Sequence, residues 1–226
     1  MKKVVFLTVL LTLAIGVCGQ KPKAPVRPAV KTVPVQQTVW TEVPDAEWGA
    51  LAKALADEDW NKAAALAARD LERLPADNDR KQLAQLRYMY LYAQTGRILD
   101  ANARADATAA ETAWNELDVM MANFIGKEFV LPPRRFVEDC DKKLNVICRV
   151  RDTPNAFRTT ATNIEGNAIH SFDYVVFETP VDIKEFDEKP TFIGGILRKA
   201  DYNEDKTKPW VLRLYFNKGF VRVVVK

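Results

Sequence analysis

The sequence of 226 residues contains one histidine, one serine and three cysteines, and this scarcity excludes several kinds of active site. His170 and Ser171 are neighbours, and neighbouring residues of a strand point to opposite faces, so they cannot build a Ser-His-Asp triad. A zinc site takes about four ligands, mostly His or Cys, and one histidine with the two cysteines beyond the N-terminal segment does not reach that number. We interpret His170 as a strand-edge residue at the surface, and we expect no catalytic residue, no metal and no cofactor.

A calcium site is a second kind of site that the sequence argues against. Oxygen-bearing residues have the alternate spacing of the first calcium-loop ligands at Asp201, Asn203, Asp205 and Thr207. However, Lys206 stands where such a loop needs glycine, and Leu212 stands where it needs a bidentate glutamate. We therefore interpret this segment as a polar loop between two strands.

Neither sign of charge is in large excess. The chain has 33 Lys and Arg against 30 Asp and Glu, a net charge of +3, and 48% of its residues are hydrophobic. These values indicate a globular chain and exclude a polybasic tail, a collagen-like chain and a wholly disordered one. The charge is nevertheless uneven, because residues 45–125 hold 9 basic and 14 acidic side chains, whereas residues 126–226 hold 18 and 15.

The N-terminus predicts export. Two lysines precede a mostly apolar run at residues 4–17, which has the length of a signal-peptide core and is too short to span a membrane. We favour a signal peptide at residues 1–19 and release into the periplasm or the medium. The alternative is lipidation of Cys18, which resembles a lipobox cysteine, although Val17 replaces the usual small residue. No other stretch is apolar enough to span a bilayer.

Composition divides the rest of the chain into three parts. Residues 20–44 contain five prolines and no apolar period, which predicts an extended linker. Residues 45–125 are rich in Ala and Leu at helical spacing and predict a helical domain, and residues 126–226 predict a β domain. In an oxidising compartment, Cys140 and Cys148 are expected to form a disulfide, and two free thiols are the alternative.

The helical part has the residue types of a known repeat. Its first set comprises Asp59, Trp60, Ala63, Leu71 and Pro75, and a second set comprises Tyr92, Gly96 and Ala101. These positions resemble the tetratricopeptide repeat, which implies stacked antiparallel helix pairs with a concave face that binds extended peptides. The second repeat then predicts a helix through residues 103–113, and a further helix at 108–122 caps the stack.

The β part alternates apolar and polar residues. Strands are predicted at residues 146–150, 174–177, 192–197, 211–216 and 220–225. Asn217-Lys218-Gly219 predicts a turn that joins the last two strands in a hairpin, and Gly194-Gly195 predicts a bulge. With a short helix near 181–186, this order resembles the oligonucleotide/oligosaccharide-binding barrel. We predict an α+β fold, with a helical hairpin repeat before a small antiparallel β-barrel or open sandwich.

Two surfaces are candidate binding sites. Basic residues cluster in sequence next to aromatic ones, and if they share a sheet face they would bind a polyanion or an acidic sugar at Arg149, Arg151, Phe157 and Arg158. The alternative is a solvated face with arginine stems over apolar surface. Three rings crowd one helix and would bind a protein partner at Tyr88, Tyr90 and Tyr92, unless they are needed for the helical core.

The sequence therefore predicts an exported, non-catalytic interaction protein of the cell envelope or the extracellular space. Its partner is expected to be a protein, and the alternative is a polyanion- or glycan-binding module that acts through a basic face of the β domain. The oligomeric state does not follow from the sequence.

Overall fold

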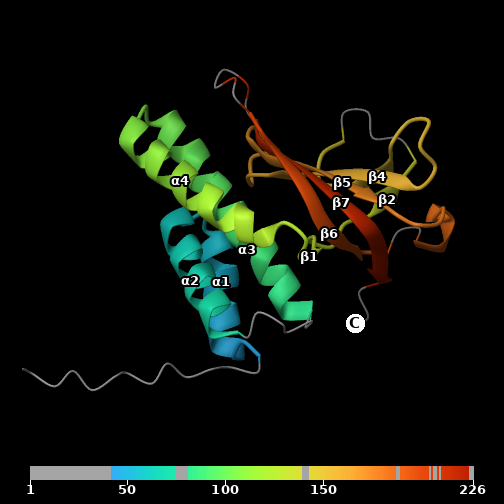
Figure 1. Cartoon of the computed structure of the whole chain (residues 1–226), viewed down its shortest axis with the longest axis horizontal. Helices are drawn as coiled ribbons and strands as arrows, with labels where there is room; N and C mark the ends of the chain where they lie inside the picture. The colour runs from blue at the N-terminus through green and yellow to red at the C-terminus, as the bar shows by residue number, and fades with distance from the viewer. Residues whose placement is uncertain are drawn as a thin grey trace, which may run out of the picture. The chain divides into compact units, whose positions relative to one another are not determined.

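The structure, a computed structural model, describes residues 42–74, 81–138, 143–186, 189–203, 205, 208 and 210–223 (Figure 1). The described residues all belong to one compact unit. Four helices precede a seven-stranded sheet, which confirms the predicted α+β class. The predicted signal peptide at 1–19, Cys18 and nearly all of the linker at 20–44 lie outside the described residues, so export and lipidation stay predictions.

The four helices pack in chain order, each against the next. They are α1 (Asp45–Ala56), α2 (Trp60–Arg73), α3 (Lys81–Ala103) and α4 (Ala107–Phe124). Two of them begin at an aspartate N-cap, since Asp59 accepts a hydrogen bond from the Lys62 N–H and Asp106 accepts one from the Ala109 N–H. These side chains satisfy backbone donors that a helix start leaves unpaired.

Small residues let the helices approach closely. Ala63 and Ala67 of α2 and Ala93 of α3 have no exposed surface. Trp60 lies directly on Gly96, where an added Cβ would come 2.3 Å from the indole ring. The close approach of α2 and α3 therefore depends on residues without bulk at this crossing.

The boundary between the last two helices differs from the prediction. A continuous helix was expected through residues 103–113, but α3 ends at Ala103 and α4 begins at Ala107. Between them Ala105 adopts a left-handed conformation with φ 54°. The apolar alanine pattern continues across this turn, so periodicity alone did not reveal it. The resemblance to the tetratricopeptide repeat stays a prediction.

The described strands of the second half of the chain form a single sheet. Its strands are β1 (Glu128–Val130), β2 (Phe136–Val137), β3 (Ile147–Arg149), β4 (Ala156–Thr162), β5 (Ile169–Val176), β6 (Thr191–Tyr202) and β7 (Trp210–Val223). Their order across the sheet is β1-β6-β7-β5-β4-β3-β2, and a 3₁₀ helix, η1 (Ile183–Phe186), connects β5 to β6.

This sheet corrects the predicted purely antiparallel pairing and, of the two predicted forms, barrel or open sandwich, it excludes the closed barrel among the described strands. The pairs β5–β7 and β2–β3 are parallel and the other pairs are antiparallel, so the sheet is mixed. The strands β1 and β2 form its two edges, so among the described strands the sheet is open. The parallel β5–β7 pairing joins strands that are not consecutive in sequence, a relationship that local alternation does not encode.

The predicted hairpin at residues 217–219 is wrong, whereas the predicted bulge at Gly194-Gly195 is confirmed. The strand β7 runs through this segment without a turn. Gly194 pairs with Phe220 and Ile196 pairs with Asn217, so β7 has one residue more than β6 here. Lys218 takes the left-handed conformation with φ 51°. One left-handed residue suits a bulge as well as a tight turn, which explains the error.

The helices and the sheet share one hydrophobic core. The ring of Phe124 at the end of α4 lies 5.4 Å from that of Phe129 on β1, which in turn lies 5.6 Å from that of Phe216 on β7. Figure 1 shows α4 leading directly into β1 beside α3. The predicted boundary at 125/126 therefore marks a change of secondary structure within one compact unit. In the described part of the chain, no helix is both long and apolar enough to cross a bilayer.

Candidate functional site

One face of the sheet carries two rows of cross-strand neighbours. Residues that pair directly across strands lie on the same face. The pairings of β4, β5, β7 and β6 give a first row, Arg158, Tyr174, Tyr215 and Lys199, and a second row, Thr160, Phe172, Arg213 and Asp201. None of these side chains is fully buried, and the three cations are exposed. We call the surface of these two rows the open face.

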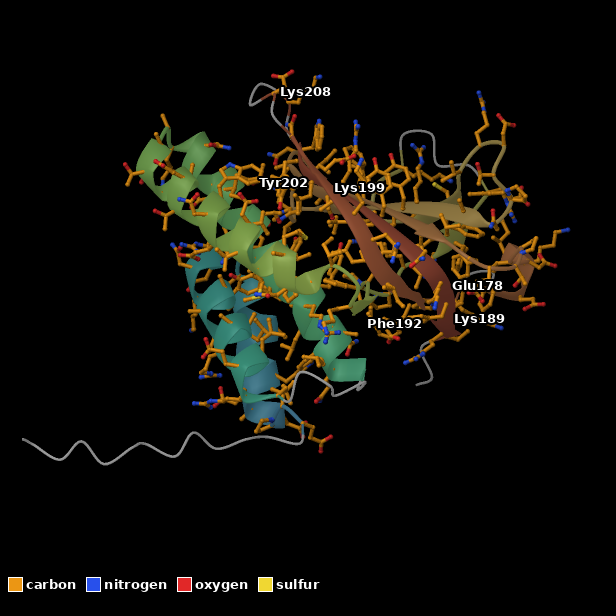
Figure 2. All side chains as sticks on the ribbon, viewed as in Figure 1. Glu178, Lys189, Phe192, Lys199, Tyr202 and Lys208 are labelled. Atoms are coloured by element: carbon orange, nitrogen blue, oxygen red, sulfur yellow. The ribbon has the colours of Figure 1, made fainter. Side chains whose placement is uncertain are left out.

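The first row holds two tyrosines between two cations. The rings of Tyr174 and Tyr215 stack with their centroids 5.2 Å apart and their planes 12° from parallel. The Lys199 ammonium lies 5.5 Å from the Tyr215 ring centroid, within cation–π range. Arg158 stands at the other end of the row and has no ion-pair partner among the described residues. Figure 2 shows Lys199 along β6, with Tyr202 of the same strand turned toward α4.

The second row extends the aromatic surface. Phe172 packs against Trp210 with ring centroids 6.0 Å apart. The guanidinium of Arg213 lies 4.6 Å from the Trp210 ring centroid. Arg213 therefore lies over an aromatic ring within cation–π range, and its side chain stays exposed.

The charge of the open face is positive. Its two rows contain Arg158, Lys199 and Arg213 against the single carboxylate of Asp201. Asp201 lies 2.8 Å from the Lys199 ammonium, and that hydrogen bond lowers the pKa of Asp201 and raises the pKa of Lys199. This pair is exposed, so it is weak and screened by salt. Asp201 also lies across from Arg213, so one carboxylate faces two cations and the two rows keep a net charge of +2.

A groove adjoins the open face beside β4. Its volume is about 190 Å³. Its lining adds a further cation and an exposed leucine to residues of the rows: Lys143, Leu144, Val146, Arg158, Thr159, Thr160 and Phe172. The positive surface therefore continues from the rows into a concave site at the edge of β4.

The arginines predicted to share a face do not share one. Arg149 pairs with Phe157, whereas the adjacent Arg158 pairs with Cys148, so Arg149 and Arg158 point to opposite faces. Arg149 lies over the ring of Phe157, donates to the carbonyl oxygens of Pro154 and Val181, and so braces the loop between β3 and β4.

Two more residues of that prediction lie elsewhere. Phe157 has no exposed surface and packs against the rings of Phe136 and Phe177. Arg151 is exposed in the turn that precedes β4. Of the four predicted ligand-binding residues, only Arg158 belongs to the open face.

Of the three tyrosines predicted to bind a protein partner, Tyr88 and Tyr90 are buried and Tyr92 is half-buried. Tyr88 and Tyr90 are each 4% exposed. The hydroxyl of Tyr88 donates to Asp173 at 2.7 Å, that of Tyr90 accepts from Gln94 at 2.7 Å, and that of Tyr92 donates to the Thr162 carbonyl at 2.7 Å. These side chains join α3 to its neighbours, as the alternative interpretation proposed, and leave no surface of Tyr88 and Tyr90 for a partner.

His170 is also misplaced by the sequence prediction. It is 1% exposed on β5, a strand with neighbours on both sides, and its Nδ1 lies 2.9 Å from the Thr95 hydroxyl oxygen. Burial lowers the pKa of His170 to about 4, and a hydrogen bond with the Tyr92 backbone offsets this only in part. The imidazole is therefore neutral at physiological pH.

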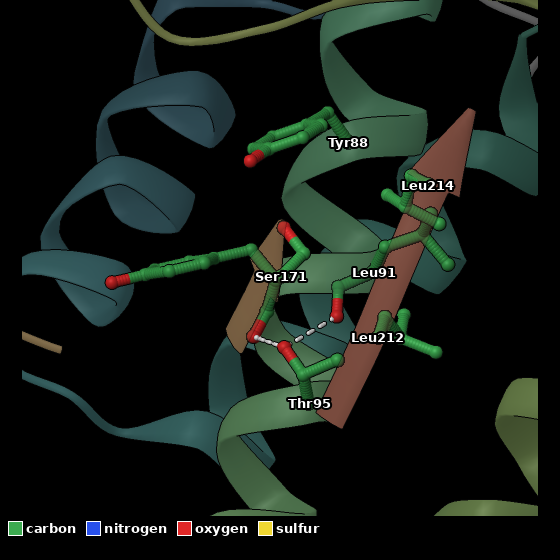
Figure 3. A pocket seen from close by; sticks show the side chains of 7 residues that line it. Tyr88, Leu91, Thr95, Ser171, Leu212 and Leu214 are labelled. Atoms are coloured by element: carbon green, nitrogen blue, oxygen red, sulfur yellow. Dashed lines mark hydrogen bonds between the residues drawn. The ribbon is translucent and has the colours of Figure 1, made fainter. Parts of the chain in front are cut away.

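Asp173 is a second buried ionisable group on β5. It has no exposed surface, and burial raises its pKa to about 6 against the hydrogen bonds from Ser171 and Tyr88. Figure 3 shows Tyr88, Thr95 and Ser171 around a cavity between α3 and β7. Its volume of about 10 Å³ is near the lower limit for one water molecule. No substrate fits beside Ser171 in this space.

Two further predictions concern a disulfide and a metal ion. Cys148 is fully buried on β3, and Cys140 lies outside the described residues, so the bond between them stays a prediction. Among the described residues, no group of three or more His, Cys, Asp or Glu side chains is placed to hold a metal ion.

The aromatic residues of the open face were not predicted from the sequence as site residues. Phe172 and Tyr174 are two residues apart, as are Arg213 and Tyr215, which is the spacing of one strand face. The sequence contains this spacing, but it does not show that β5 pairs with β7, which brings Phe172 and Tyr174 next to Arg213 and Tyr215.

Comparison of the chain with family models, with curated proteins and with solved structures finds no match.

Proposed function

We propose that the protein is an exported, non-catalytic binding protein whose open face binds an acidic polysaccharide. The observation that carries this proposal is the pair of cross-strand rows, in which exposed cations flank stacked and half-buried rings. Export itself rests on the predicted signal peptide. Secretion favours a polysaccharide over a nucleic acid as the anionic polymer.

The spacing of the cations suits an extended polymer. Arg158 and Lys199 are separated by three strand spacings, or about 14 Å. A small anion cannot span this distance, whereas a polymer with repeated carboxylates or sulfates contacts both cations at once. The half-buried rings of Phe172 and Tyr174 offer apolar surface to the sugar rings between the charges.

The uneven distribution of charge along the chain also favours binding of a polyanion at the sheet. Residues 126–226 carry a net +3 and residues 45–125 a net −5, counted over the full sequence. A polyanion is repelled by the helical segment and attracted by the sheet segment, which steers it toward the open face. A protein partner on the tyrosines of α3 is no longer favoured, because Tyr88 and Tyr90 are buried.

Retention on immobilised heparin, a sulfated polysaccharide, tests the proposal. The protein should bind at low ionic strength and elute as sodium chloride rises, because the contacts are exposed and screened. It should pass through a column of neutral dextran. Passage through the heparin column at low ionic strength would contradict the proposal, and equal retention on both columns would show that charge is not involved.

A further inference from the structure

A second, larger pocket lies away from the open face, between the helices and the turn that joins β4 to β5. Its volume is about 410 Å³, within the range of small-molecule sites. Its walls come from α1, α3, the β1–β2 segment, the segment before β3, the end of β4 and the β4–β5 turn: Leu55, Tyr88, Met89, Tyr92, Pro132, Arg134, Asn145, Ala161, Thr162, Asn163 and Ile164.

Several polar groups of the wall already bond to the protein. The hydroxyl of Tyr88 donates to Asp173, and that of Tyr92 donates to the Thr162 carbonyl. The amide of Asn145 donates to the Thr162 hydroxyl at 2.8 Å. These groups hold the wall together and have little left to offer a ligand.

Arg134 differs from these groups. Its backbone is fixed by two hydrogen bonds with Thr191, at 2.9 and 2.8 Å. Its Nε is buried and has no hydrogen-bond partner, and its guanidinium forms no ion pair among the described residues. The charge of this guanidinium also acts on the buried Asp173, whose pKa it lowers against the effect of burial. Arg134 is the one cation among the lining residues, and the planar fork of arginine matches a carboxylate. Arg134 is thus the wall group to which an anionic ligand would bind.

The lining of the pocket also contains apolar side chains, Ile164 among them. Ile164 is 71% exposed at the β4–β5 turn, although it is a large hydrophobic residue. Its backbone N–H donates to the Glu58 carboxylate at 2.6 Å, which ties the turn to the loop before α2. The negative charge of Glu58 near Ile164 disfavours an anion there. A ligand with one charge would place it at Arg134 and its apolar part toward Ile164 and Leu55.

We propose that this pocket binds a small amphiphilic monocarboxylate, with the carboxylate on Arg134 and the apolar body along Leu55, Met89 and Ile164. The site is separate from the open face and does not depend on polysaccharide binding. The proposed binding involves no covalent step. The lining supplies one cation, apolar walls, and polar groups that already form hydrogen bonds within the protein.

Calorimetric titration with octanoate tests the site, with octan-1-ol as the uncharged probe. Wild type and Arg135→Gln, a change of the exposed neighbouring arginine, should bind octanoate equally. Arg134→Gln should weaken octanoate binding by about tenfold or more, the worth of a charged hydrogen bond, and leave octan-1-ol binding unchanged. No heat with wild type, or equal octanoate affinity of Arg134→Gln and wild type, would overturn the proposal.

Ile164→Glu provides an independent variant if Arg134→Gln fails to fold. Ile164 is highly exposed, so its replacement should not disturb the core. A second carboxylate beside Glu58 should weaken binding of octanoate more than that of octan-1-ol. Unchanged binding of both probes by Ile164→Glu would also overturn the proposal.

Discussion

Tyr174 and Tyr215 stack across the parallel pair β5–β7, with ring centroids 5.2 Å apart and planes 12° from parallel. The two strands are separated in sequence by η1 and β6. The stack places Arg158 of β4 next to one ring and Lys199 of β6 next to the other. The two stacked rings therefore fill the row between its two cations.

Replacement of a ring in this stack should lower stability. Tyr174→Leu is expected to reduce the free energy of unfolding by about 0.5–1.5 kcal/mol beyond the lost buried area, because the ring pair is lost. Tyr174→Phe keeps the ring and should stay close to wild type. Urea unfolding of the two variants measures the difference. Equal unfolding midpoints for Tyr174→Leu and Tyr174→Phe would show that the ring stack adds nothing to the stability of the protein.

The contact of Trp60 with Gly96 predicts opposite effects of one substitution at two helical glycines. Gly96→Ala should destabilise the protein by about 1–3 kcal/mol, because the new Cβ would lie 2.3 Å from the indole ring. Gly49→Ala in α1 meets no atom within 4 Å and should stabilise the protein by about 0.5–1 kcal/mol through helix propensity. Thermal unfolding distinguishes them. A stabilising Gly96→Ala would refute the close helix crossing.

The bulge of β7 predicts a second contrast between adjacent positions. Lys218→Gly should raise stability by a few tenths to about 1 kcal/mol, because glycine adopts the left-handed conformation without strain. Gly219→Ala should lower stability, since its Cβ would lie 2.9 Å from the Phe177 ring and from a Val175 methyl. Denaturant midpoints provide the measurement. In a hairpin turn away from the sheet, Gly219→Ala would make neither contact.

The two buried ionisable groups of β5 predict opposing pH effects. Asp173 has a folded-state pKa raised to about 6, so its contribution to stability falls as pH rises from about 4 to 6. His170 has a folded-state pKa lowered to about 4, so its contribution falls as pH drops from about 6.5 to 4. Each effect corresponds to about 3 kcal/mol over that window, and the two largely cancel in wild type.

Single variants should separate these effects. Asp173→Asn leaves the histidine, so stability should then fall as pH drops from about 6.5 to 4. His170→Gln leaves the aspartate, so stability should then rise over the same change. Urea unfolding at several pH values measures both slopes. Equal slopes in the two variants would contradict the assigned burial of these groups.

Local sequence signals predicted the helices, but they predicted the sheet only in part. Asp59 before an alanine-rich apolar period marks the start of α2, and both signals lie within one turn of the chain. The open face depends on Tyr174 meeting Tyr215, a contact between strands that local alternation cannot pair. The error at His170 has the same origin, because only the sheet order makes β5 an interior strand.

The candidate sites show the same limit. Clustering of Arg149, Arg151 and Arg158 in sequence indicated a basic surface, but the strand register places Arg149 and Arg158 on opposite faces. Arg213 and Lys199 reach the open face from β7 and β6, which are remote in sequence from Arg158. The sequence therefore predicted the kind of surface and one of its residues, and the pairing of strands supplied the others.

A comparison of two charge-matched double variants on heparin tests the central claim most directly. Arg158→Ala/Arg213→Ala removes two cations of the open face. Lys53→Ala/Arg104→Ala removes two exposed cations from the helical half of the chain, one in α1 and one in the turn after α3. Both variants have the same net charge. We predict that the first elutes at clearly lower salt than wild type and that the second elutes close to wild type. Equal elution of the two variants would show that net charge, and not the open face, determines binding.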